Sequence, residues 1–286
     1  MNRANILSTA AVLLSATMAV ALPQAPTQSS NPGAAPAAVS PAAPQASSPA
    51  ASKSPQPKTQ AEYDAFKAAA SQNDPAKLEA SATDFAQKYP DSELRGFLFQ
   101  EAMGQYQAAN NSDKALEMAR TTLKYDPYNA VALLTSAQIL AERTHDSDLD
   151  RDDRLAEATG NARVALQHAS DIQQPPNMTP EQFVGAMAQL RGTAHEVIAT
   201  VAFKKADYFS AIKEYNAAAS EEKDHTDAVV WLRLAVANDK TNDMRAAMES
   251  VNKAIAASEP GSQIRQLSEQ EKSRLTKLSS SNPASK

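Results

Sequence analysis

From Ala61 onward, short clusters of proline, aspartate and asparagine interrupt a chain that is otherwise rich in Ala, Leu, Lys, Glu and Gln. These clusters read QNDP, YPDS, NNSD, YDPYN, PPNMTP and NDKTND, and each favours the end of one helix and the start of another. The residues between them are strong helix formers, and none of these segments alternates apolar and polar residues as a strand would. The sequence therefore predicts an all-α fold, with helices near 61–71, 75–88, 93–109, 113–125, 129–143, 153–169, 180–205, 208–220, 226–238, 242–257 and 263–278.

The apolar residues of these segments recur every three or four positions, which places them on one face of a helix. The rhythm is clearest in the long segment 180–205, at Phe183, Met187, Leu190, Ala194, Val197 and Val201. Each helix thus has an apolar face that a neighbour must cover. Asp113 and Ser210 stand where an N-cap or first-turn residue is expected.

Three stretches share one organisation: a helix, a short polar turn and a second helix with an alanine near its start. The alanines are Ala115, Ala211 and Ala247. Small side chains at such positions let two helix backbones approach closely. A helix pair of this kind cannot bury its apolar face alone, so several pairs are expected to stack and to leave an extended surface.

This pattern resembles the tetratricopeptide repeat (TPR) family, whose unit reads W-x2-L-G-x2-Y, then A-x3-F and then P. The best match has its key positions at Phe99, Ala102, Met103, Tyr106, Ala115, Ala119 and Pro127. Further units begin near Leu133, His195 and Trp231, although His195 replaces the usual bulky residue. The resemblance implies a TPR-like helical-hairpin solenoid over 59–260, with a C-terminal capping helix and tail at 261–286. A helical solenoid or bundle of another type is the alternative.

Residues 1–58 are predicted to lie outside this domain. The start is arranged like a secretory signal peptide, with Arg3, an apolar run and a possible cleavage site at Ala19–Ala21, so 1–21 is assigned to it. A retained membrane anchor is the alternative. Residues 22–58 hold nine of the 17 prolines and no aromatic residue, which predicts a disordered Pro/Ala/Ser-rich linker. The protein is therefore expected to be exported, to the periplasm or to the medium, with no membrane span after cleavage.

The composition excludes several classes of chemistry. The chain has no cysteine, so it has no disulfide, thiolate metal site or cysteine nucleophile. Its formal net charge of -5 and its scattered basic residues argue against nucleic-acid binding. There is no glycine-rich phosphate loop, and we expect no cofactor.

The stretch HDSDLDRDD, at 145–153, is the one candidate for a metal site. Asp146, Asp148, Asp150 and Glu157 partly match the spacing of a calcium-binding EF-hand loop, but Arg151 stands where that loop needs glycine. The favoured interpretation is a solvated loop between two helices, and a weak calcium site is the alternative.

Two other patterns bear on catalysis. Ser210 and Lys213 match S-x-x-K, the motif of a serine nucleophile in enzymes that act on the cell wall, but the partner motifs S-D-N and K-T-G are missing. The four histidines have no zinc spacing, and His195 is expected to pack between helices. We therefore expect no enzymatic activity, with a cell-wall-directed serine hydrolase or a calcium-responsive module as alternatives.

The remaining hypothesis is binding of a protein or peptide. In the TPR family the first helix of each pair lines a concave groove. The matching positions here form a polar set of mixed charge, at Gln100, Gln107, Gln138, Glu142, Glu196, Thr200, Lys204, Asp239 and Lys240. The resemblance thus implies a scaffold or adaptor of the bacterial cell envelope. The identity of its partner and its oligomeric state do not follow from the sequence.

Overall fold

The computed structural model describes residues 55–175 and 177–281, and within these ranges it is all-helical, without strands. The helices are α2 (Gln60–Ala70), α3 (Pro75–Lys88), α4 (Arg95–Ala108), α5 (Ser112–Tyr125), α6 (Ala130–Arg143), α7 (Arg151–His168), α8 (Pro180–Lys204), α9 (Tyr208–Glu222), α10 (Ala228–Lys240), α11 (Met244–Ala257) and α12 (Gln263–Ser281). Short 3-10 turns, η1 (Ala169–Asp171) and η2 (Lys223–His225), follow α7 and α9. The predicted all-α class is confirmed for these residues.

The predicted helices agree closely with those observed. Each of the predicted segments contains one helix, and their ends differ by two residues or fewer, except that α12 continues to Ser281. The predicted signal peptide at 1–21, most of the linker and the last five residues lie outside the described residues.

Capping explains why the polar clusters separate the helices. Side-chain oxygens accept hydrogen bonds from backbone N–H groups of the first turn, at Thr59, Asp74, Asn111, Asn129, Thr179, Asp207, Asp227 and Asp243. Thr179 and Gln182 form a complete capping box at the start of α8. Asp113 and Ser210 lie in the first turns of α5 and α9, where Asn111 and Asp207 are the caps.

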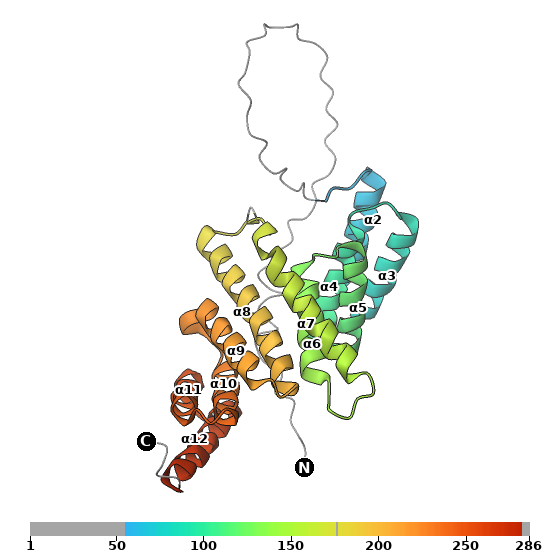
Figure 1. The fold of residues 1–286 in the computed structure, drawn as a ribbon. Coiled ribbons are helices and arrows are strands. Elements are labelled where there is room, and N and C mark those ends of the chain that lie inside the picture. The colour runs from blue at the N-terminus through green and yellow to red at the C-terminus, as the bar shows by residue number, and fades with distance from the viewer. Residues whose placement is uncertain (1–54, 176, 282–286) are drawn as a thin grey trace, which may run out of the picture.

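Consecutive helices pack as pairs, most extensively α4 with α5, α6 with α7, α8 with α9, and α10 with α11. Ala115, Ala158, Ala211 and Ala247 of the second helices are completely buried, as expected for close helix contacts. In Figure 1 the chain advances from α2 at one end to α12 at the other. The even-numbered helices also contact one another, α2 with α4, α4 with α6, α6 with α8 and α10 with α12, and we call them the even-numbered row.

The apolar faces predicted from the sequence point inward. On α8, Met187, Leu190, Ala194, Val197 and Val201 are buried and Phe183 is partly buried. Among the described residues, no helix combines the length and the apolar character needed to cross a bilayer.

The C-terminal helix departs from the prediction in one respect. In the sequence of this helix, the apolar positions Ile264, Leu267, Leu275 and Leu278 predict a single buried side. Leu275 is fully buried, but Leu278 is 42% exposed, and the fully buried Ser268 lies on the inner face instead. The inner face of α12 is therefore narrower and more polar than its leucines indicate.

The end of the predicted linker touches the folded part. Pro57 is buried, and the Lys58 Nζ atom donates a hydrogen bond of 2.7 Å to the carbonyl oxygen of Asp91. The Lys58 N–H donates to the carboxylate of Glu62, which is only 3% exposed and also accepts from Ser92 Oγ. Residues 57 and 58 thus belong structurally with α2 and the corner before α4.

Candidate functional site

Four of the nine groove positions predicted from the sequence come together in space. Glu142 lies on the last turn of α6, while Glu196, Thr200 and Lys204 lie one turn apart along α8. A spacing of four residues places these three on a single helix face. The even-numbered row therefore presents these four side chains at one site. We call these four residues and Arg233 of α10 the α6–α8–α10 cluster.

Arg233 connects three helices. Its guanidinium donates to Glu142 of α6 at 2.8–3.0 Å and to Glu196 of α8 at 3.2 Å. It also donates to Thr200 Oγ1 at 3.1 Å, and this hydroxyl is 3.2 Å from the Tyr215 hydroxyl of α9. The Arg233 side chain is 26% exposed and that of Glu196 only 12%, so these charges are largely removed from water. Hydrogen bonds to charged partners offset that desolvation.

Lys204 extends the cluster toward the acidic loop. Its ammonium group donates to the carbonyl oxygens of Glu142 and Thr144, at 3.1 and 2.8 Å, at the C-terminal end of α6. A cation suits that end because the helix carbonyls are unpaired there. The Arg151 guanidinium in turn donates to the Lys204 carbonyl oxygen at 2.6 Å, which ties α7 to α8.

The cluster has two carboxylates, Glu142 and Glu196, and two cations, Lys204 and Arg233. Burial raises the pKa of Glu196 to about 7, and the negative charges of Glu142 and Asp227 act in the same direction, while Arg233 opposes them. Burial likewise raises the pKa of Tyr215 to about 12. The cluster thus has a single guanidinium between two carboxylates, one of which is readily protonated.

The other five predicted groove residues lie elsewhere along the even-numbered row. Gln100 accepts a hydrogen bond of 2.8 Å from Asn129, and Asp239 pairs with Arg274 of α12 at 2.5 Å. Gln107 and Gln138 are half-buried on α4 and α6, and Lys240 is exposed at the end of α10. By helical register, Gln138 shares a face with Glu142, and Lys240 shares one with Arg233.

The aspartate-rich loop is held by arginines. Arg151 binds Asp146 at 3.2 Å, and Arg154 lies 3.7 Å from Asp148 and 3.8 Å from Asp150. Glu157, the predicted fourth ligand, instead forms a two-bond ion pair with Arg120 of α5. Within residues 55–175 and 177–281, no three acidic or histidine side chains converge in a way that could hold a metal ion.

Ser210 and Lys213 differ in their surroundings. The backbone N–H and the hydroxyl of Ser210 both bond to the cap residue Asp207. Lys213 is 82% exposed and lies 3.8 Å from Glu214.

His195 packs between α8 and α9 as predicted, with its Nδ1 atom 2.7 Å from Glu214 Oε2.

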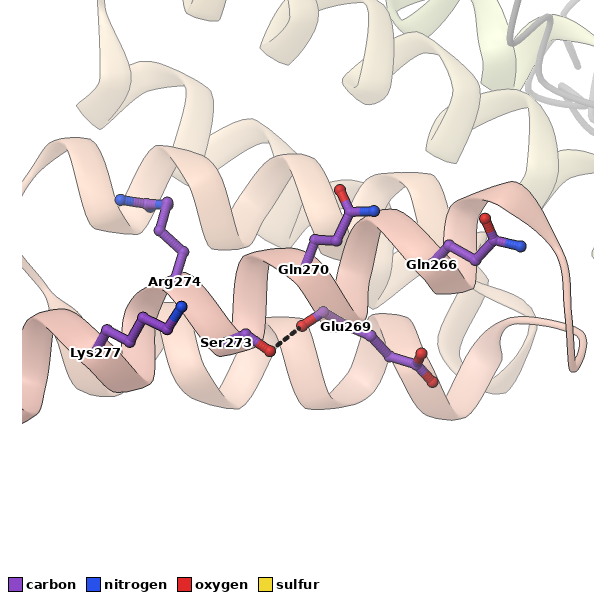
Figure 2. A pocket seen from close by; sticks show the side chains of 6 residues that line it. All are labelled: Gln266, Glu269, Gln270, Ser273, Arg274 and Lys277. Atoms are coloured by element: carbon purple, nitrogen blue, oxygen red, sulfur yellow. Dashed lines mark hydrogen bonds between the residues drawn. The ribbon is translucent and has the colours of Figure 1, made fainter.

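A shallow hollow follows the outer face of α12 (Figure 2). It is lined by Gln266, Glu269, Gln270, Ser273, Arg274 and Lys277, which are exposed and all belong to this one helix. Because one helix encloses it on one side only, it is a polar surface and not a binding cavity.

Arg233 is the principal residue that the sequence reasoning missed. A detectable signal was present, since it is the one charged residue in the apolar stretch VVWLRLAVA, where a charge needs a buried partner. Comparison with known proteins adds no assignment: no protein-family model and no curated protein matches this chain.

Proposed function

We propose that this protein is a non-enzymatic scaffold or adaptor that binds another protein, or a peptide segment, on its even-numbered row. In this proposal the helix pairs form a TPR-like solenoid, and the α6–α8–α10 cluster is the centre of its binding surface. Export to a bacterial periplasm or to the medium belongs to the same proposal, and rests on the sequence of residues 1–21.

The observation that carries this proposal is the convergence of Glu142, Glu196, Thr200 and Lys204. They come from two successive first helices, and Arg233 joins them to a third. Repeat proteins use such extended surfaces, formed by equivalent helices of successive units, to hold a partner.

The cluster is also suited to specific recognition. Its ion pairs fix the side chains before a partner arrives, which lowers the entropy lost on binding. The Glu142 side chain remains 35% exposed, so its carboxylate remains within reach of a partner. A partner whose polar groups match this arrangement would gain specificity more than raw affinity.

Site-specific photo-crosslinking tests the proposal. A photoreactive amino acid is placed at Gln138 or Lys240 on the even-numbered row and, as the control, at the exposed Lys213 of α9. The full chain is then irradiated in an extract of the cell envelope of its source organism. We expect one and the same protein to be crosslinked from both row positions and not from Lys213. Equal crosslinking from all three positions, or none from the row, would contradict the proposal.

A binding measurement with the crosslinked protein then locates the site. Lys240→Glu changes an exposed charge, so the fold should remain intact. Because the proposal places Lys240 on the binding surface, we expect this change to weaken binding by roughly tenfold. Lys213→Glu is the matched control, with the same change of charge on another face, and should bind as the wild type does.

A further inference from the structure

The junction of α8, α9 and α10 brings together two carboxylates, Glu222 and Glu196. Of these, only Glu196 belongs to the α6–α8–α10 cluster. Glu222 is the last residue of α9, immediately before η2, and it is half-buried. A Cβ atom built on Gly192 of α8 would lie 2.5 Å from Glu222 Oε1, so this carboxylate rests directly on the α8 backbone. Glu196 lies one turn further along α8, next to it.

Acidic groups from several elements face these two carboxylates. The charges of Glu142 on α6 and of Asp227, the N-cap of α10, both act on Glu196, and those of Asp227 and Glu196 act on Glu222. The backbone N–H of Asp227 donates a hydrogen bond to Glu222, and Tyr215 of α9 lies within the same electrostatic environment.

The cations near the junction are mostly committed to other partners. Arg233 binds Glu196, but it also binds Glu142. On α8, Arg191 pairs with Glu221 at 2.7 Å and His195 with Glu214 at 2.7 Å. Lys204 donates to backbone carbonyl oxygens of α6. Lys223 and His225 of η2 are exposed to solvent.

The backbone holds Glu222 in this position. Lys223 directly follows it with φ 53° and ψ -118°, and residues other than glycine seldom adopt such a positive φ. Such a conformation persists where the surrounding structure imposes it. The corner at η2 therefore directs the end of α9, with its carboxylate, against α8 and the start of α10.

We propose that this junction is a proton-responsive joint, in which Glu196 and Glu222 bind protons at mildly acidic pH and thereby tighten the packing of α8, α9 and α10. When both carboxyl groups are ionised, their mutual repulsion and their incomplete solvation loosen the joint. The adjoining α6–α8–α10 cluster would change its charge over the same pH range.

The direction of the effect follows from linkage. Burial raises the pKa of Glu222 to about 7, and the negative charges of Glu196 and Asp227 raise it further. Burial also raises the pKa of Glu196 to about 7. In the unfolded chain a glutamate ionises near its ordinary pKa of about 4.3. Between these values the folded protein binds more protons than the unfolded one, so stability falls as pH rises toward 7. Because the two groups interact, they titrate as a pair.

Two measurements on the full chain test the joint. The first follows the glutamate side-chain carboxyl carbons by NMR as the pH is raised. The second follows urea unfolding from pH 5 to pH 8 by the fluorescence of Trp231, the single tryptophan, which lies on α10 two residues before Arg233. The variants are Glu196→Gln and Glu222→Gln, which imitate the protonated side chains, and the control is Glu101→Gln at an exposed position of α4.

In the wild type we expect two glutamate carboxyl signals to titrate above pH 6 and the unfolding midpoint to fall as pH rises. Glu222→Gln should remove one of these titrations and flatten the fall, whereas Glu101→Gln should leave both as in the wild type. If all glutamates titrate near their ordinary pKa, or if the pH dependence is the same in all four proteins, the proposal is overturned. The NMR titration of the wild type decides the matter even if a variant does not fold.

Discussion

The two ends of the helical stack are held together in different ways. At the N-terminal end, α2 to α5 enclose large side chains, among them Phe66, Phe85, Phe99, Met103 and Tyr106, all 5% exposed or less. At the C-terminal end, a smaller cluster between α10, α11 and α12 buries Ala235, Ala247, Val251 and Leu275, with Leu232, Met244 and Met248 partly buried against it.

This difference shows that successive helix pairs of one chain can be stabilised by different forces. The N-terminal helices bury much apolar area per residue, which is the main source of folding stability. The C-terminal helices bury fewer large side chains, and charge pairs also hold them, such as Arg233 with Glu142 and Arg274 with Asp239. We expect the C-terminal helices to open first, because opening free energies vary across a structure.

The largest effect is expected from Phe85→Ala in the N-terminal core. The Phe85 ring packs edge to face on Phe66, with centroids 6.1 Å apart, and lies 5.0 Å from the ring of Tyr89. Removing it leaves a cavity between α2 and α3, at a cost of about 3–5 kcal/mol in the free energy of unfolding. Urea denaturation followed by circular dichroism measures this cost. A loss below about 1 kcal/mol would show that this end is not held by its aromatic core.

A smaller effect is expected from Leu275→Ala at the other end. Leu275 is completely buried, but α12 is terminal and can detach without unfolding the rest. We expect a loss of about 2–3 kcal/mol, at the low end for buried leucines, together with faster hydrogen exchange confined to α12 and its neighbours. The matched control is Leu278→Ala on the same helix, where the side chain is 42% exposed and the expected loss is within about 0.5 kcal/mol. Equal losses for both leucines would contradict the packing of α12.

A third effect concerns the start of the folded region. Deleting residues 22–54 should leave the unfolding free energy unchanged, since the segment has little apolar surface to bury. Extending the deletion through Lys58 removes the bonds to Glu62 and Asp91, and should cost about 1–2 kcal/mol. Thermal unfolding of the two truncated proteins measures the difference. If both behave alike, Pro57 and Lys58 contribute nothing to the fold.

The helices could be predicted from sequence because their signals are local. The caps, the turn residues and the apolar period all act within a few residues, which is why the predicted boundaries agree so well. The inner face of α12 was predicted less well, because four leucine and isoleucine positions suit more than one face. Only contact with α10 and α11 selects Ser268 and Leu275.

The site was predictable only in part. The resemblance to the TPR family pointed to Glu142, Glu196, Thr200 and Lys204 as groove positions, and a spacing of four places the last three on one face of a helix. It could not identify Arg233 as their connection, since Glu142 lies 91 residues earlier in the chain. Nor could it predict the hydrogen bond from Lys204 to a carbonyl oxygen of α6 or the ion pair between Glu157 and Arg120. Both interactions depend on how separate helix pairs are stacked.

The most direct test of this account is a double-mutant cycle between Glu142 and Arg233, because the candidate binding surface requires α6 and α10 to meet there. The variants are Glu142→Gln, Arg233→Met and the double change, each measured by urea unfolding at neutral pH. We expect a coupling free energy of at least about 0.5 kcal/mol, within the range for residues in contact, and a weaker coupling in high salt. A coupling indistinguishable from zero at low salt would mean that the two helices do not meet through this pair, and would contradict the account.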